Sequence, residues 1–277
     1  MLKFFDRYWK VLTFPPIIFL IFCSVVLILN AVNTGYIIER DIELKGGKII
    51  TVEADADVSF VQTLFPNAKV TKTTGLRSSL LIETGFEDDE NKIIATLKEN
   101  NITGETSIRT VGPALGEVFW QQTQLAIIAA FILMSVVIFI LFRSPVPCSA
   151  VMLAAATDMI GALTLMHFLG IELSLAAIGA LMMIIGYSVD TDVLLTTEML
   201  KSTEGEPFER ICSAAKTGLT MSLAAIAVLS AAWLVSNVFV IKTITAVLLL
   251  GLFVDIPATW LTNAGILRWW KGDAKKS

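Results

Sequence analysis

Six long apolar segments constrain the fold of this chain more than any other feature of its sequence. A helix needs about 20 mainly apolar residues to cross roughly 30 Å of bilayer hydrocarbon. Six segments meet that requirement, and 55% of the 277 residues are hydrophobic. The sequence therefore predicts a polytopic α-helical membrane protein. Its spans are expected at residues 15–34, 122–142, 147–168, 174–197, 218–235 and 243–264.

Positive charges predict the orientation of these spans. With six spans both termini lie on one side, whereas the two short loops on the opposite side contain only Lys242. The positive-inside rule then places both termini in the cytoplasm of a cell-membrane protein. We expect a cytoplasmic N-terminus and first span at 1–34, an extracytoplasmic domain at 35–121, a bundle of five spans at 122–264 and a cytoplasmic tail at 265–277. The basic residues on the cytoplasmic side are Lys3, Arg7, Lys10, Arg143, Lys201, Arg210, Lys216, Arg268, Lys271, Lys275 and Lys276.

The long loop after the first span has the pattern of a small α+β domain. Strands are expected at 47–54, 67–74, 78–85 and 105–111, and helices at 57–65 and 87–101, with the turn GLR at 75–77. The resulting order β-α-β-β-α-β predicts a ferredoxin-like fold. Further along, residues 205–218 suggest a short amphipathic segment on the inner membrane surface.

Four acidic residues lie inside the predicted spans, namely Asp158, Asp190, Asp192 and Asp255. An acid at the centre of a span costs about 2.5–3.5 kcal/mol on insertion scales. The plain alternative is that some of these acids lie near a membrane interface or cap a broken helix. Asp255, for example, is followed two residues later by Pro257, which disturbs helices. The spans offer no cation to pair with these acids, so we infer that they exchange protons, or that another subunit supplies their partners.

Helical geometry divides the two acids of the fourth span. Ser188, Asp192 and Thr196 are four residues apart and share one face. Asp190 lies about 200° around the helix from Asp192 and shares a flank with Gly186. We therefore expect one acid to face the bundle interior and the other to meet another span.

Several classes of function are disfavoured. The net charge of −4 argues against nucleic-acid binding, and three cysteines beside apolar segments indicate no disulfide framework. A single histidine and no CxxC or HExxH spacing predict no metal site and no cofactor.

Motifs along the whole chain resemble the SecF family, the smaller half of the SecDF protein-export complexes of the resistance-nodulation-division (RND) type. RDIELKGG resembles the family's Gly-Ile-Asp-Phe-x-Gly-Gly motif, VGPALGE its Val-Gly-Pro-x-x-Gly motif, and GYSVDTD its fourth-span signature. TDM around Asp158 resembles His-Asp-Val, with Thr157 in place of His. The matching residues besides the spans' acids are Asp41, Ile42, Gly46, Gly47, Val111, Gly112, Pro113, Gly116, Gly186, Tyr187 and Ser188.

Departures from the bacterial pattern indicate an archaeal-type member. Asp190 falls where bacterial SecF chains have Asn, and it aligns with the Asp of a Gly-Val-Asp-Ala-Asn motif in SecD. Met221 stands where a basic residue is common.

The resemblance implies a non-enzymatic accessory subunit of the Sec translocon. It implies pairing with SecD, contact with a SecYE-type translocon, with the unfolded polypeptide in transit and with membrane lipid. It also implies coupling of an ion gradient to export through the span acids. One alternative is half of an RND-type proton-driven small-molecule exporter. Another is an intramembrane aspartyl protease, against which the missing Gly-x-Gly-Asp motif argues.

Overall fold

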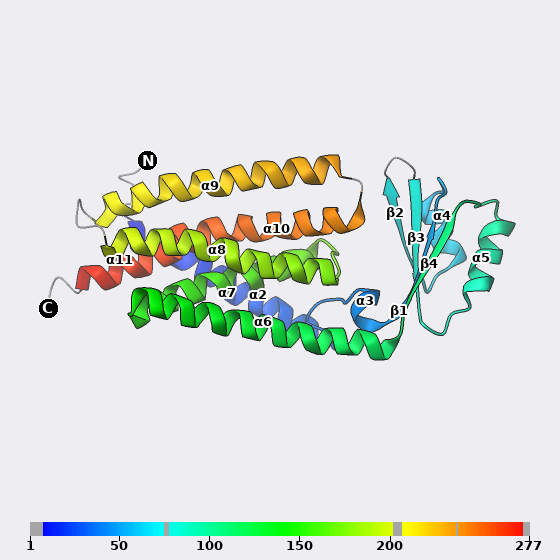
Figure 1. Ribbon diagram of the computed structural model, residues 1–277, viewed down its shortest axis with the longest axis horizontal. Coiled ribbons are helices and arrows are strands. Elements are labelled where there is room, and N and C mark those ends of the chain that lie inside the picture. Colours follow the sequence, from blue (N-terminus) through cyan, green and yellow to red (C-terminus); the bar gives the residue numbers. More distant parts are fainter. Residues whose placement is uncertain (1–7, 75–77, 202–206, 237, 274–277) are drawn as a thin grey trace.

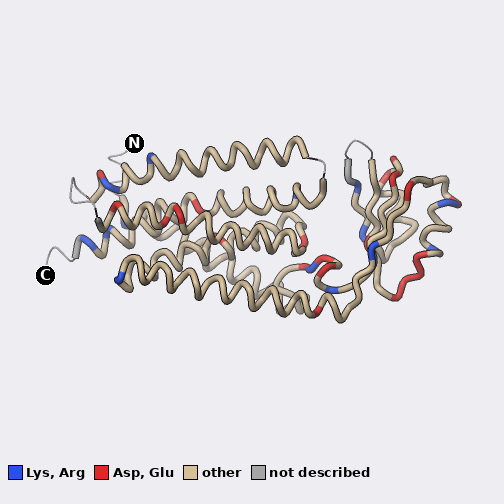
Figure 2. The backbone as a smooth tube through the Cα atoms, in the orientation of Figure 1, with Lys and Arg blue, Asp and Glu red and all other residues tan. Residues whose placement is uncertain are grey.

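A helical bundle joined end to end with a small sheet domain makes up the molecule (Figure 1). The computed structural model describes residues 8–74, 78–201, 207–236 and 238–273. The turn predicted at 75–77 lies outside these residues. Figure 2 shows acidic positions inside an otherwise uncharged bundle.

Six helices in the described part of the chain are long and apolar enough to cross a membrane. They confirm that this is a polytopic α-helical membrane protein. The first runs from Tyr8 to Thr34 and contains α2 (Phe14–Thr34). The others are α6 (Pro113–Phe142), α7 (Pro145–Phe168), α8 (Leu175–Lys201), α9 (Pro207–Val235) and a last span in which α10 (Phe239–Pro257) continues into a π-helix, η1 (Ala258–Asn263), and α11 (Ala264–Asp273).

Five of the six spans begin earlier than expected, and the starts of α6 and α9 differ most. α6 begins at Pro113, nine residues before the predicted start, because Gly112 is extended and proline is well suited to the first helical position. The amphipathic segment predicted at 205–218 is not separate, since its described part is the first turns of α9. α9 is continuous through Gly218, and the Trp260 ring packs so closely against this residue that a Cβ would clash with it.

The helices divide into an inner and an outer set. In α7, 61% of the most apolar stretch is buried, compared with 6% in α6 and 11% in α9. α8 and the last span are also largely buried, at 50% and 44%. The inner helices α7, α8 and α10 carry all four span acids, and three of these acids, Asp158, Asp192 and Asp255, are buried at the centre of the bundle.

The sheet domain follows the first span. Its elements are β1 (Gly47–Val52), α4 (Val58–Leu64), β2 (Lys69–Thr74), β3 (Ser78–Thr84), α5 (Glu90–Glu99) and β4 (Thr106–Val111). The strands form one antiparallel sheet in the order β2-β3-β1-β4. Ile50, Leu80 and Ile82 of one sheet face pack with Val61 of α4 and Leu97 of α5. The order of elements is the one that the sequence predicted.

The other face of the sheet is directed towards the bundle. Lys69, Glu83, Ile49 and Arg109 form one row across the four strands. A short helix, α3 (Ile42–Lys45), connects the first span to β1 and lies beside α6. The row and α3 together form the junction between the two parts of the molecule.

Candidate functional site

Three of the four span acids meet in the bundle interior. Asp158 of α7, Asp192 of α8 and Asp255 of α10 are each 0% exposed. The Ser188 hydroxyl donates to Asp158 Oδ2 at 2.5 Å, and Asp158 and Asp255 lie within interaction distance of each other. None of the three makes an ion pair with a described residue. The site is therefore a group of acids held by neutral hydrogen-bond donors.

The π-helix supplies two of those donors. Asn263 Nδ2 donates to Asp192 Oδ1 at 2.6 Å, and Thr259 Oγ1 lies 3.0 Å from the same oxygen. Pro257, which has no N–H, precedes η1. Thr259 and Asn263 are four residues apart, a spacing that places two side chains nearly on one face of a helix. The proline noted in the sequence thus leads directly into the residues that bind Asp192.

One hydroxyl links two of the acids. Thr259 Oγ1 lies 3.1 Å from Asp255 Oδ1 as well as 3.0 Å from Asp192 Oδ1. A hydroxyl has a single hydrogen to donate. The Thr259 hydroxyl therefore either shares its hydrogen between the two carboxyl oxygens, or donates to one of them while the other carboxyl is protonated and donates to the Thr259 oxygen. The arrangement therefore suits a group that holds and releases a proton.

Several polar atoms at the site have spare hydrogen-bonding capacity. One oxygen of each acid is buried without a partner in the described structure, as is the Thr196 hydroxyl on the Asp192 face. Such atoms cost free energy unless a proton, an ion or water satisfies them. Thr157, which stands where the family has His, donates only to the Leu153 carbonyl of its own helix.

Asp190 does not join this group. It is exposed on the outer side of α8, and no described residue pairs with it. Gly186 beside it has open space around its Cα, and the Tyr187 side chain is 37% exposed. The four acids thus occupy two places, a buried site of three and one on an uncovered helix face.

The glycines of the two family motifs pack against each other at the junction. Gly46 has φ +82°, and a Cβ there would lie 2.7 Å from Pro113 Cα. A Cβ on Gly116 would lie 2.8 Å from Gly46 N, and one on Gly47 would lie 2.7 Å from the Thr84 carbonyl oxygen. Both motifs therefore serve one close contact between α3, β1 and the start of α6.

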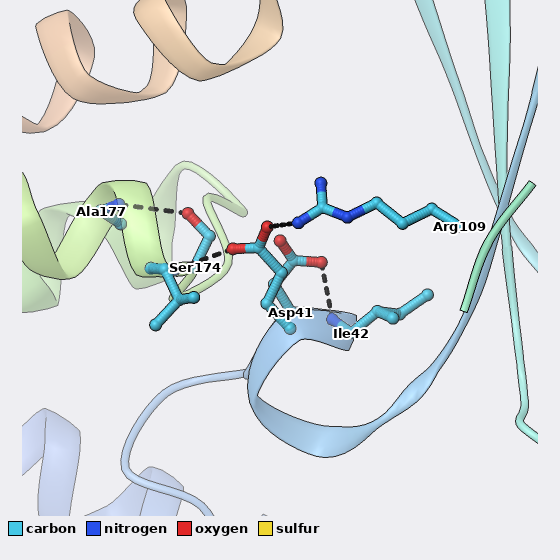
Figure 3. Close-up of polar contacts among 7 residues, drawn as sticks. Asp41, Ile42, Arg109, Ser174 and Ala177 are labelled. Carbon is cyan, nitrogen blue, oxygen red and sulfur yellow. Dashed lines mark hydrogen bonds and ion pairs between the residues drawn. The ribbon is translucent and has the colours of Figure 1, made fainter. Parts of the chain in front are cut away.

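Glu43 connects three elements at the same junction. Figure 3 labels its partner Arg109 and the neighbouring Asp41 and Ile42. Glu43 Oε1 lies 2.5 Å from Arg109 Nη2 of β4, and its Oε2 accepts from the Leu175 N–H at the start of α8 at 3.2 Å. Asp41 caps α3 by accepting from the Ile42 N–H at 2.6 Å. Backbone hydrogen bonds between residues 39–41 and Leu173 strengthen the link. The sheet, α3 and α8 are thereby tied together.

A second group of acids lies in this junction. Carboxylate oxygens of Asp41, Glu83 and Glu172 all lie within 4.8 Å of one another. Lys69 Nζ lies 2.8 Å from Glu172 and supplies positive charge to the group. These acids come from three distant parts of the sequence, so no spacing rule could have found them.

Burial and mutual repulsion change the ionisation of this group. Burial, followed by the charge of Glu172, raises the pKa of Glu83 to about 7, and burial also raises the pKa of Asp41. Burial alone would lower the pKa of Lys69, but the hydrogen bond and charge of Glu172 raise it overall. Glu83 consequently titrates near neutral pH.

Comparisons with known proteins place the chain in a family. Residues 92–273 match the family described as protein export membrane protein SecD/SecF, C-terminal. The protein-export membrane protein SecF of Pyrococcus furiosus is 39% identical over 94% of this chain and 90% of its own length. The SecF protein of Methanothermobacter thermautotrophicus is 41% identical over 89% and 88%.

A solved structure shares the fold. The crystal structure of SecDF from Thermus thermophilus, described as a translocon-associated membrane protein, superposes with a TM-score of 0.75 at 19% identity. The match covers 96% of this chain but only 38% of that longer one. The family match and the relatives at 39–41% identity show that this chain belongs to the SecD/SecF family of protein-export membrane proteins, with the SecF proteins of archaea.

Proposed function

We propose that this membrane protein promotes protein export as one half of a larger unit, whose other half is a SecD-type chain. The family supports the role in export. The partner is supported by the solved SecDF chain, of which this chain matches only 38%. Both termini would face the cytoplasm, and the ferredoxin-like domain would face outward, in reach of a SecYE-type translocon and an emerging polypeptide.

The uncovered face of α8 is the observation that carries the proposed pairing. It presents glycines, methionines, a tyrosine and one acid at helical spacing, and small residues allow close helix packing in membranes. A carboxylate facing hydrocarbon is costly, so a partner helix with a polar or basic group would stabilise Asp190. The exposed residues of this face are Gly179, Met182, Met183, Gly186, Tyr187 and Asp190.

Co-purification with the SecD-type chain of the same organism tests the pairing. Gly186→Leu places a branched side chain on the proposed interface and should reduce recovery of the complex at least about tenfold. Ala129→Leu, on the exposed side of the outer helix α6, serves as the matched control and should leave recovery unchanged. Undiminished recovery of the Gly186→Leu complex would exclude this face as the interface.

The buried acids are proposed to couple an ion gradient, most directly a proton gradient, to export. Asp158, Asp192 and Asp255 are buried, contact neutral hydrogen-bond donors and make no ion pair with a described residue. Thr259 links Asp192 to Asp255. Protonation of Asp192 or Asp255 would change the Thr259 and Asn263 contacts and so the packing of α8 against η1.

α8 can carry such a change to the outer domain. Asp192 lies 17 residues after Leu175, which corresponds to about 25 Å along a helix. The N-terminal end of α8 is held by Glu43, which also binds Arg109 of the sheet. Movement of α8 at the acids would therefore act on the domain that meets the exported chain.

A further inference from the structure

A narrow apolar slot runs along α9 at the end of the bundle where α2 begins and α11 ends. Its volume is about 390 Å³, within the range of ligand pockets. Phe208 and Leu219 of α9 line its two ends, and Ile256 and Arg268 line it from the last span. Arg268 lies over the Phe208 ring at 5.6 Å, so the charged group is at the Phe208 end.

The dimensions of the slot match a single hydrocarbon chain. Phe208 and Leu219 are eleven residues apart, which is about 16 Å along a helix. A helix of that length, with a diameter of about 10–12 Å, would need roughly 1,500 Å³, several times the slot volume of about 390 Å³.

The chemistry of the slot is that of a lipid site. Apart from Arg268 its lining is almost entirely apolar, so water would find few hydrogen-bond partners inside. The Arg268 guanidinium also lies 5.1 Å from the Trp9 ring, and Trp and Arg together are typical of the level of lipid headgroups. The Trp260 Nε1–H, in the wall of the slot, is buried and has no acceptor among the described residues.

We propose that this slot binds one membrane lipid with an anionic headgroup. The headgroup phosphate would meet Arg268, and one chain would lie along α9 towards Leu219 and Ile256. Trp260 belongs to η1, so the lipid would contact the same π-helix that holds Asp192.

Native mass spectrometry of the purified full chain tests the proposal. Phosphatidylglycerol and phosphatidylcholine with identical chains are titrated separately, and one phosphatidylglycerol should bind about tenfold more tightly, because a guanidinium–phosphate contact is charge-assisted. Ala215→Phe, which fills the slot, should weaken binding of both lipids about tenfold. Ala129→Phe, on the exposed side of α6, is the matched control and should change neither.

Arg268→Gln separates the headgroup contact from the slot itself. This variant should lose the preference for phosphatidylglycerol while retaining binding of phosphatidylcholine, and its side chain is only partly buried, so the fold should tolerate the change. Equal affinity of the unmodified chain for the two lipids would overturn the proposal. So would an unchanged preference in Arg268→Gln, or equal losses in Ala215→Phe and Ala129→Phe.

Discussion

Asp192 is the buried acid whose carboxyl group is held by contacts from the π-helix. Two donors from one π-helix, Thr259 and Asn263, contact its Oδ1, while its Oδ2 is buried without a described partner. A side chain in this position has a well-fixed geometry and one unused oxygen, which is what a reversible proton acceptor requires.

Replacing Asp192 by Asn separates geometry from ionisation. The amide oxygen can still accept from Thr259 and Asn263. The free energy of unfolding, followed through the melting temperature, should therefore change by no more than about 1 kcal/mol. Export should fall at least about tenfold, because Asn cannot take up a proton. Pulse–chase maturation of a secreted precursor measures the rate.

Asp55→Asn provides the surface control for that experiment. The Asp55 side chain is 76% exposed in the sheet domain, and its loss should leave export unchanged. Normal export by Asp192→Asn would remove this acid from the coupling mechanism.

The raised pKa of Glu83 predicts that the stability of the folded protein depends on pH. This pKa is about 7 in the folded protein, against an ordinary value of 4.5. Between these values the folded protein holds a proton that the unfolded chain has lost, so stability falls as the pH rises through this window. Allowing for partial exposure, the Glu83 contribution should be of the order of 1 kcal/mol.

Melting temperatures between pH 4.5 and 8 measure this effect. The unmodified chain should lose stability across the window more steeply than Glu83→Gln, which cannot ionise. The pKa of Asp41 in the junction is also raised, and Asp41 is present in both proteins. The contribution of Glu83 is therefore the difference between the two curves of melting temperature against pH. Parallel curves would show that Glu83 does not ionise in this range.

At the scale of whole elements, local sequence pattern accounts for the helices and strands. The six spans and the order β-α-β-β-α-β follow from apolar length and periodicity, which are local properties. The early start of α6 at Pro113 was missed because the helix extends beyond its apolar stretch, where hydropathy gives no signal. The π-helix was missed because Pro257 indicates a disturbance but not its form.

The candidate site could be predicted only in part. Sequence identified the acids and separated Asp190 from Asp192 by helical geometry. It missed Thr259 and Asn263, although two polar residues soon after Pro257 in an apolar span were a usable signal. The junction group of Asp41, Glu83 and Glu172 depends on long-range packing, which no local pattern encodes.

The contact between α3 and α6 gives a prediction at this scale. Gly116→Ala would place its Cβ 2.8 Å from Gly46 N, and backbone cannot move as easily as a side chain. Ala is more favourable than Gly inside a helix by about 1 kcal/mol, but the clash outweighs this gain. We expect the free energy of unfolding to fall by about 1–2 kcal/mol in total. Thermal unfolding of the purified chain measures the change.

Gly112→Ala is the matched control for this contact. Gly112 immediately precedes α6, and nothing lies within 4 Å of a Cβ built there. The substitution should change stability by less than about 0.5 kcal/mol. Equal effects of the two substitutions would show that α6 and α3 are not in the close contact described.

At the scale of the whole molecule, α8 runs between two distant groups of acids. The buried acids lie within the bundle, and the junction acids lie where the sheet domain meets it. Glu43 holds the N-terminal end of α8 and pairs with Arg109 of β4. If the acids drive export, this connection is the route by which a change at the acids reaches the sheet domain.

Breaking the Arg109–Glu43 ion pair should therefore reduce export while leaving the complex assembled. Arg109→Gln removes the charge 2.5 Å from Glu43, whereas Lys72→Gln removes a similar pair with Asp55 away from the junction. Because the Arg109 side chain is 61% exposed, stability should change by less than about 1 kcal/mol. Precursor maturation should slow several-fold in Arg109→Gln and not in Lys72→Gln, with equal recovery of the SecD-type partner in both. Equal export by the two variants would mean that the outer domain works without this link to α8.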